Sequence, residues 1–109
     1  MNAPDILRGH TDTIILNILK CGDSYGYEIA KTIYDVSGGV FDITEATVYV
    51  AFRRLEQAGF IEAYWGDNTG GARRRYYKIT ESGTEKYVRL AAEWQNASGL
   101  LNKLIGGNL

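Results

Sequence analysis

The sequence predicts one α+β domain that is mostly α-helical, and three observations support that class. Apolar residues recur at helical spacing in four separate segments of the chain. One stretch after the third of these segments alternates like a pair of strands around a glycine-rich turn. The chain has 109 residues, of which 45% are hydrophobic, and this is enough to bury one modest core and no more.

Two helices are expected in the first third of the chain. The first runs from Thr11 to Lys20 and the second from about Tyr25 to Val36, and glycine-containing segments end both of them. The inward face of the first is expected to carry Ile14, Ile15, Ile18 and Leu19. The inward face of the second is expected to carry Tyr25, Ile29, Ile33 and Val36.

A third helix is predicted within the segment from Thr44 to Gly59. Thr44 can cap it, although Thr47 stands where a complete capping box has Glu or Gln. At 100° per residue, the apolar arc consists of Val48, Ala51, Phe52 and Leu55. The outer surface consists of Val50 and Arg53, with Arg54 and Thr47 on one flank and Tyr49 on the other. Paired arginines on a helix are often merely solvated, but the exposed Val50 and Tyr49 favour a surface that binds nucleic acid.

A hairpin follows the third helix. Ile61–Trp65 alternates as a strand and Tyr76–Ile79 can pair with it, while Gly66–Ala72 forms a tip rich in residues that tolerate positive φ. The second strand is expected to open with Arg73, Arg74 and Arg75, which alternate across it, so that at least one arginine faces each side. Long cationic side chains on such a support suit contacts with phosphate. The alternative is a charged edge that only prevents aggregation, but three adjacent like charges repel one another and make it less favourable.

A last helix is expected from Thr80 onward. Its apolar spacing alternates between three and four residues, which is typical of a helix that packs on another helix: Tyr87, Leu90, Ala91, Trp94, Ala97, Leu101, Leu104 and Ile105. A core this small has little interior left to cover such a helix. We therefore expect a homodimer, with residues 1–80 as a winged helix-turn-helix DNA-binding domain and residues 81–109 as a dimerisation helix in one compact unit.

The charge of the chain is unevenly distributed. Residues 53–78 contain six basic and three acidic side chains, a local charge of +3, whereas the whole chain has a net charge of −1, which leaves −4 for the remainder. An acidic protein with a local basic patch suits a selective DNA binder better than one that coats all DNA.

Several other classes fit poorly. His10 and Cys21 are the only His and Cys, and no third metal ligand or nucleophile-bearing turn accompanies them. We therefore expect no enzyme, no metal and no cofactor, with His10 on the surface and Cys21 as a small apolar residue. One cysteine cannot form an internal disulfide, and no apolar run is long enough for a membrane span. We expect a cytoplasmic protein without a membrane partner.

Three segments together resemble the PadR family of bacterial transcriptional regulators: LRGHTDTIILNILKCGDSYGYEI, TEATVYVAFRRLEQAGFIEAYWGD and GGARRRYYKITESG. The short carboxy-terminal helix resembles the branch of that family with a single such helix. The resemblance implies that the third helix enters the major groove and that the wing arginines contact phosphates. Tyr49 matches a motif tyrosine whose hydroxyl meets a phosphate, and Val50 departs from the proline of many members. The expected DNA-binding residues are Thr47, Tyr49, Arg53, Arg54, Arg73, Arg74 and Arg75.

The same resemblance implies a small-molecule role for Trp94. A tryptophan on an apolar seam is more often a core filler, but in this branch the matching residue pairs across the dimer axis and sandwiches planar aromatic compounds. The other expected lining residues are Ile6, Thr13, Asn17, Ala97, Ser98 and Leu101. Ser98 replaces an aspartate of a multidrug-binding member, which weakens the case for cationic ligands and leaves neutral ligands, anionic ligands or none.

The sequence therefore predicts a homodimeric repressor on a pseudo-palindromic double-stranded DNA operator, with a planar hydrophobic effector at the dimer interface. Two alternatives remain at this stage. One is a winged-helix module that binds a protein partner without sequence-specific DNA binding, and the other is a dimer that binds ligands with no effect on DNA.

Overall fold

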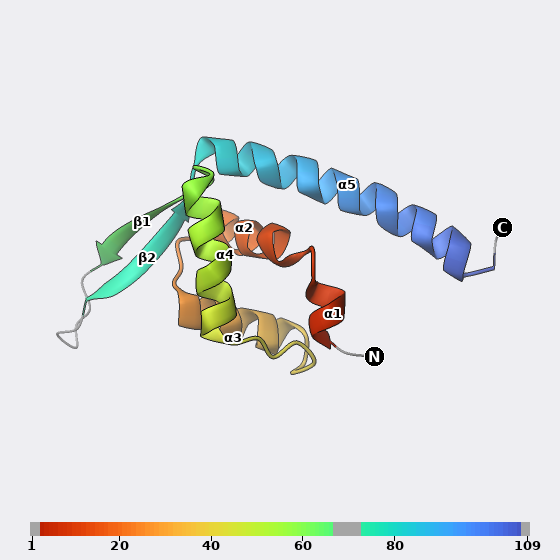
Figure 1. The fold of residues 1–109 in the computed structure, drawn as a ribbon, viewed down its shortest axis with the longest axis horizontal. Helices are drawn as coiled ribbons and strands as arrows, with labels where there is room; N and C mark the ends of the chain where they lie inside the picture. The colour runs from red at the N-terminus through yellow and green to blue at the C-terminus, as the bar shows by residue number, and fades with distance from the viewer. Residues whose placement is uncertain (1–2, 67–72, 108–109) are drawn as a thin grey trace.

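The computed structural model describes residues 3–66 and 73–107 and consists of five helices and one hairpin in those ranges (Figure 1). The elements are α1 (Ala3–Leu7), α2 (Thr11–Cys21), α3 (Gly26–Val36), α4 (Glu45–Gln57), β1 (Ile61–Gly66), β2 (Arg74–Ile79) and α5 (Glu81–Ile105). The fold is thus α+β and mostly α, as predicted. The predicted tip from Gly66 to Ala72 lies outside the described residues, apart from Gly66 itself.

The core lies where α2, α3 and α4 meet the base of the hairpin. The apolar arc predicted for α4 is confirmed, since each of its four members is almost completely buried. Phe52 of that arc stacks on Tyr77 of β2, with ring centroids 3.9 Å apart and planes 23° apart. This stack joins the helix to the hairpin through apolar contact.

The predicted cap of α4 is also confirmed. The Thr44 hydroxyl accepts a hydrogen bond from the backbone N–H of Thr47 at 3.1 Å, and the two threonine hydroxyls are 3.0 Å apart. The cap therefore satisfies one of the free N–H groups of the first turn without the Glu or Gln of a complete capping box.

Three expectations differ from the structure at the ends of elements. The short helix α1 was not predicted, because five residues show no periodicity; buried Leu7 anchors its end. Val36 was expected to face the core but is 84% exposed, because it lies in the last turn of α3, where no other part of the described chain covers it. The second strand begins at Arg74, one residue after the first of the three arginines with which it was expected to open, and its pairing extends to Gly66 opposite Arg74.

The hairpin is antiparallel and its base is fixed to the helical core. The register runs from the pair Ile61–Ile79 to the pair Gly66–Arg74. Ser24, in the turn between α2 and α3, exchanges two backbone hydrogen bonds with Tyr77, at 3.1 and 2.8 Å. The wing therefore has a third attachment besides the chain connections at its two ends.

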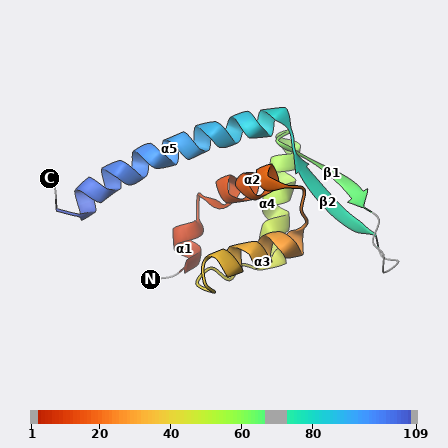
Figure 2. The ribbon, with the colours of Figure 1, turned by 180° about the vertical axis from the view of Figure 1, so that it is seen from behind.

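The long helix α5 begins at the base of the wing and crosses over α2 (Figure 2). The Thr80 hydroxyl accepts from the N–H of Gly83 at 3.1 Å and donates to the carbonyl of Gly59 at 2.7 Å. Tyr87 and Leu90 pack against the core, whereas Trp94 and the apolar residues after it are exposed. Because α5 extends beyond the core, the molecule is elongated and measures 58 × 30 × 20 Å (Figure 1). Among the described helices, none has the length and apolar character needed to cross a membrane.

Gly83 allows α5 to start where it does. A Cβ at this buried glycine would lie 2.0 Å from the carbonyl oxygen of Phe60, whereas a Cβ at Gly99 in the same helix would meet no atom within 4 Å. We predict that Gly83→Ala lowers the free energy of unfolding by about 2 kcal/mol or more, because rigid backbone would have to move. Gly99→Ala should raise it by about 0.5–1 kcal/mol through helix propensity.

Chemical denaturation of the two variants beside the wild type tests this pair of predictions. A Gly83→Ala variant as stable as Gly99→Ala would contradict the close approach of α5 to Phe60.

Candidate nucleic-acid interface

The outer face of α4 carries the helix residues predicted to contact DNA. Val50, Thr47 and Tyr49 are exposed, and so are Arg53 and Arg54. Because the opposite side of α4 is fully buried, this outer face is fixed in orientation by the core. The predicted division of α4 into an inner arc and an outer surface is therefore confirmed.

The three wing arginines lie against aromatic rings. The guanidinium of Arg74 is 4.0 Å from the ring centroid of Tyr25, and those of Arg73 and Arg75 are each 5.8 Å from that of Trp65. Cation–π contact holds an arginine in place while its N–H groups remain available to an anion. The arginines therefore alternate between two supports, in agreement with the strand alternation expected from the sequence.

Arg75 differs from its two neighbours because it also meets a carboxylate. Its Nε donates to the Tyr77 hydroxyl at 3.1 Å, and its Nη2 is 3.5 Å from Glu56 Oε2 near the end of α4. Arg75 therefore connects the wing to α4, and part of its charge is neutralised there.

A depression of about 480 Å³ lies between the wing and the first turns of α3 and α4. Its walls come from aromatic and charged side chains: Tyr25, Tyr27, Glu45, Tyr49, Trp65, Arg73, Arg74 and Arg75. The structure therefore brings Tyr49 and the three wing arginines together, although Tyr49 and Arg73 are far apart in the sequence.

Tyr49 is held at the start of α3 by contact with a glycine. A Cβ at Gly26 would lie 2.8 Å from Cζ of Tyr49, so the ring occupies the space that any other residue would fill. The ring also meets Phe52 edge to face at 5.9 Å. Partial burial, followed by the nearby charge of Glu45, raises the pKa of Tyr49 above its ordinary value, so the hydroxyl stays protonated and can donate to an anion.

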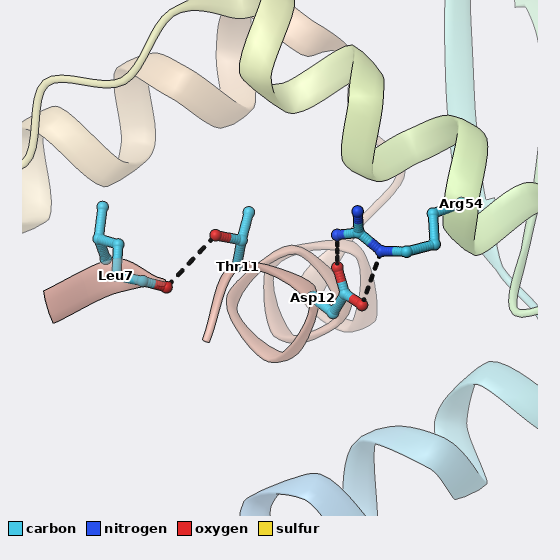
Figure 3. Close-up of polar contacts among 4 residues, drawn as sticks. All are labelled: Leu7, Thr11, Asp12 and Arg54. Atoms are coloured by element: carbon cyan, nitrogen blue, oxygen red, sulfur yellow. Dashed lines mark hydrogen bonds and ion pairs between the residues drawn. The ribbon is translucent and has the colours of Figure 1, made fainter. Parts of the chain in front are cut away.

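The remaining predicted residues of α4 lie on a different flank. Thr47, Val50 and Arg54 line a second depression, of about 520 Å³, together with residues at the junction of α1 and α2. Arg54 forms an ion pair with Asp12 there, and Thr11 at the start of α2 donates to the carbonyl of Leu7 at 3.4 Å (Figure 3). Within the described residues Arg53 forms no ion pair.

The residues expected to line a ligand site come from α1, α2 and α5. Ile6, Ala97 and Leu101 are exposed, Thr13 and Ser98 are half-buried, and Trp94 is 44% exposed. The Trp94 ring meets His10 edge to face, with centroids 4.7 Å apart, so His10 is half-buried rather than free on the surface as expected. Asn17 lines another depression, of about 760 Å³, between α2 and α3, where exposed Cys21 also lies.

Sequence reasoning missed several residues of this surface. Tyr25 was assigned to the core, but its ring supports Arg74, and Trp65 was treated only as a strand residue. The high density of aromatic residues around the arginines was the available signal, since Tyr64 and Tyr76 also stack beside them at 5.7 Å. The ion pair between Asp12 and Arg54 could not be predicted from the sequence, because 42 positions separate the two residues.

The described part of the chain contains no cluster of three His, Cys, Asp or Glu side chains suited to a metal ion. The surface instead combines an exposed helix face with a cationic antiparallel hairpin on a three-helix core. That combination defines a winged helix-turn-helix protein.

Comparison with known proteins places the chain within that class. Residues 15–89 match the model of the transcriptional regulator PadR-like family, and the chain belongs to this family of transcriptional regulators. An uncharacterised protein X of Lysinibacillus sphaericus is 42% identical over 107 residues, which is 98% of each chain.

Two solved structures extend the comparison. A transcriptional regulator of Clostridium thermocellum is similar with a TM-score of 0.82 and 45% identity, over 91% of this chain and 96% of that one. Bacillus subtilis PadR in complex with operator DNA has a TM-score of 0.68 and 20% identity, over 76% of this chain and 47% of that one. The second likeness shows that the winged fold is shared.

Proposed function

We propose that this protein is a homodimeric repressor that binds a pseudo-palindromic operator and responds to a planar hydrophobic ligand at the dimer interface. The observation that carries the DNA-binding part is the row of wing arginines supported on Trp65 and Tyr25, beside the exposed face of α4. The operator complex of the related B. subtilis protein supports it, as does membership of the family.

In this proposal α4 enters the major groove and the wing reaches the flanking backbone. Thr47, Tyr49 and Arg53 face the duplex from the helix. Arg73 and Arg74 contact phosphates most directly, because they lie on aromatic rings that leave their N–H groups available, whereas Arg75 is shared with Glu56. Arg54 lies on the same face, but Asp12 holds it.

The dimer in this proposal forms through α5. The second half of that helix exposes an apolar stripe, of which Trp94 is partly covered by His10; the stripe consists of Trp94, Leu100, Leu101, Leu104 and Ile105, the last of them 82% exposed. Stripes of this kind on a soluble protein are typical of an interface. Two copies joined there would present two α4 helices about one DNA turn, roughly 34 Å, apart.

The ligand in this proposal lies against Trp94, whose ring is partly exposed and is supported by His10 from one side only. A planar compound between two Trp94 rings would favour one spacing of the α4 helices over another. Such a preference is what an effector needs in order to change DNA affinity.

Arg74→Ala tests the wing. We predict weaker binding to every duplex sequence and a salt dependence of log K that is less steep by about 0.9, since one phosphate contact is lost. The matched control is Arg89→Ala, which removes an exposed arginine of α5 that does not line the depression beside the wing. Fluorescence anisotropy with the duplex upstream of the gene and a scrambled duplex, at several salt concentrations, measures both. Equal behaviour of the two variants would remove the wing from the interface.

Leu101→Glu tests the dimer. A carboxylate in the centre of the stripe should shift the protein to a monomer in sedimentation equilibrium, because the charge would be buried without a partner. Val88→Glu is the control, since Val88 is exposed on another face of α5. A Leu101→Glu protein that remains a dimer would place the interface elsewhere.

Planar aromatic probes test the effector site. Trp65 and Trp94 are the two tryptophans, so a Trp65→Phe protein reports on Trp94 alone. We expect a planar probe to quench the emission of this variant with saturation and to weaken operator binding by the wild-type protein over the same concentration range. Quenching without an effect on DNA would support a passive ligand-binding dimer. Equal, weak binding of both duplexes by the wild type would favour a protein-interaction module instead.

A further inference from the structure

The contact between Asp12 and Arg54 joins the first turn of α2 to the exposed face of α4. The Nε of Arg54 donates to Asp12 Oδ2 at 3.2 Å, and its Nη2 donates to Oδ1 of the same carboxylate (Figure 3). This forked geometry satisfies both carboxylate oxygens and occupies one edge of the guanidinium. That edge is therefore not available to a phosphate while the pair is intact.

The pair is accessible to water. The side chains of Arg54 and Asp12 are 54% and 33% exposed, respectively. The hydrogen bond to Asp12 is the main cause that raises the pKa of Arg54, while partial burial opposes the rise. Ion pairs at this exposure contribute little to stability, and they can exchange one anion for another at small cost. The structure therefore presents a cation whose counter-ion can be replaced.

The ion pair lies beside a depression that contains a second arginine, Arg8. The depression beside it is lined by Arg8, Thr11, Thr47 and Val50, among others. Arg8 is also paired, with Asp5 at 3.1 Å. On this flank each of these two cations has a carboxylate partner, whereas Arg73 and Arg74 at the wing lie on aromatic rings. The two flanks of α4 thus offer different attraction to a phosphate.

We propose that Asp12 is a specificity-determining residue, which masks Arg54 from DNA in general and releases it only where α4 is fully seated. This inference rests on the proposed DNA-binding function. On a non-cognate duplex the wing arginines bind phosphate, while Arg54 remains paired with Asp12. On the operator, base contacts hold α4 close to the backbone, and a phosphate replaces the Asp12 carboxylate. Masking therefore lowers the affinity for non-cognate DNA more than the affinity for the operator.

The test uses the full chain and anisotropy titrations with an operator duplex and a scrambled duplex of equal length and composition, over a series of salt concentrations. Asp12→Asn keeps the shape of the side chain and removes its charge. We expect it to tighten binding to the scrambled duplex by about 3–10-fold and to steepen the salt dependence there by about 0.9, the contribution of one phosphate contact. The operator affinity should rise less, so the ratio of the two affinities falls.

Two further variants separate masking from a change in net charge. Glu85→Gln removes the same charge from an exposed position of α5 that lines neither depression, and it should strengthen binding to both duplexes slightly and equally. In an Arg54→Gln background, Asp12→Asn should have no more effect than Glu85→Gln, because the masked cation is absent. A gain that persists in that background, or one that Glu85→Gln reproduces, would overturn the proposal.

The outcome also distinguishes this inference from the proposed function. If the wild type binds the two duplexes equally, the proposed operator function fails. The effect of Asp12→Asn on the scrambled duplex, and its dependence on Arg54, would still decide whether Asp12 masks that cation. Thermal unfolding of each variant confirms that the fold is intact before the comparison is made.

Discussion

Tyr77 is the residue on which the geometry of this protein depends. Its ring stacks on Phe52 of α4, its backbone exchanges two hydrogen bonds with Ser24 between α2 and α3, and its hydroxyl accepts from Arg75. One buried residue of β2 thus fixes the wing to the turn before α3 and to α4. Because the bond to Ser24 is between backbone groups and the stack is between large rings, the wing base cannot shift without the loss of both.

That attachment explains how a chain with a net charge of −1 presents a cationic surface. The arginines of the wing lie on Tyr25 and Trp65, and these rings are positioned by the same strands and turn. Aromatic support keeps the charges of Arg73 and Arg74 in place without a carboxylate beside them, whereas Arg75 also meets Glu56 and Arg54 meets Asp12. The choice of support at each arginine therefore decides how strongly it can attract a phosphate.

Much of this arrangement could be predicted from the sequence. The periodicity of α4 correctly assigned Val48, Ala51, Phe52 and Leu55 to the core, because burial follows helical spacing directly. The prediction that Val36 of α3 faces the core was wrong, because periodicity does not say whether another element covers the last turn of a helix. The partners of the arginines could not be predicted, since Tyr25 and Asp12 reach them only through the tertiary fold.

The close approach of Gly83 to the Phe60 carbonyl has a mechanical consequence. The contact holds the start of α5 close against the backbone before β1, so we expect the helix and the winged unit to turn together. Over the 25 residues of α5, roughly 37 Å, a rotation of about 5° displaces the far end by roughly 3 Å. That displacement is comparable to the rise of about 3.4 Å between successive nucleotides of one DNA strand. In the proposed dimer, a few degrees of change where two α5 helices cross would move each α4 by about one step along the groove.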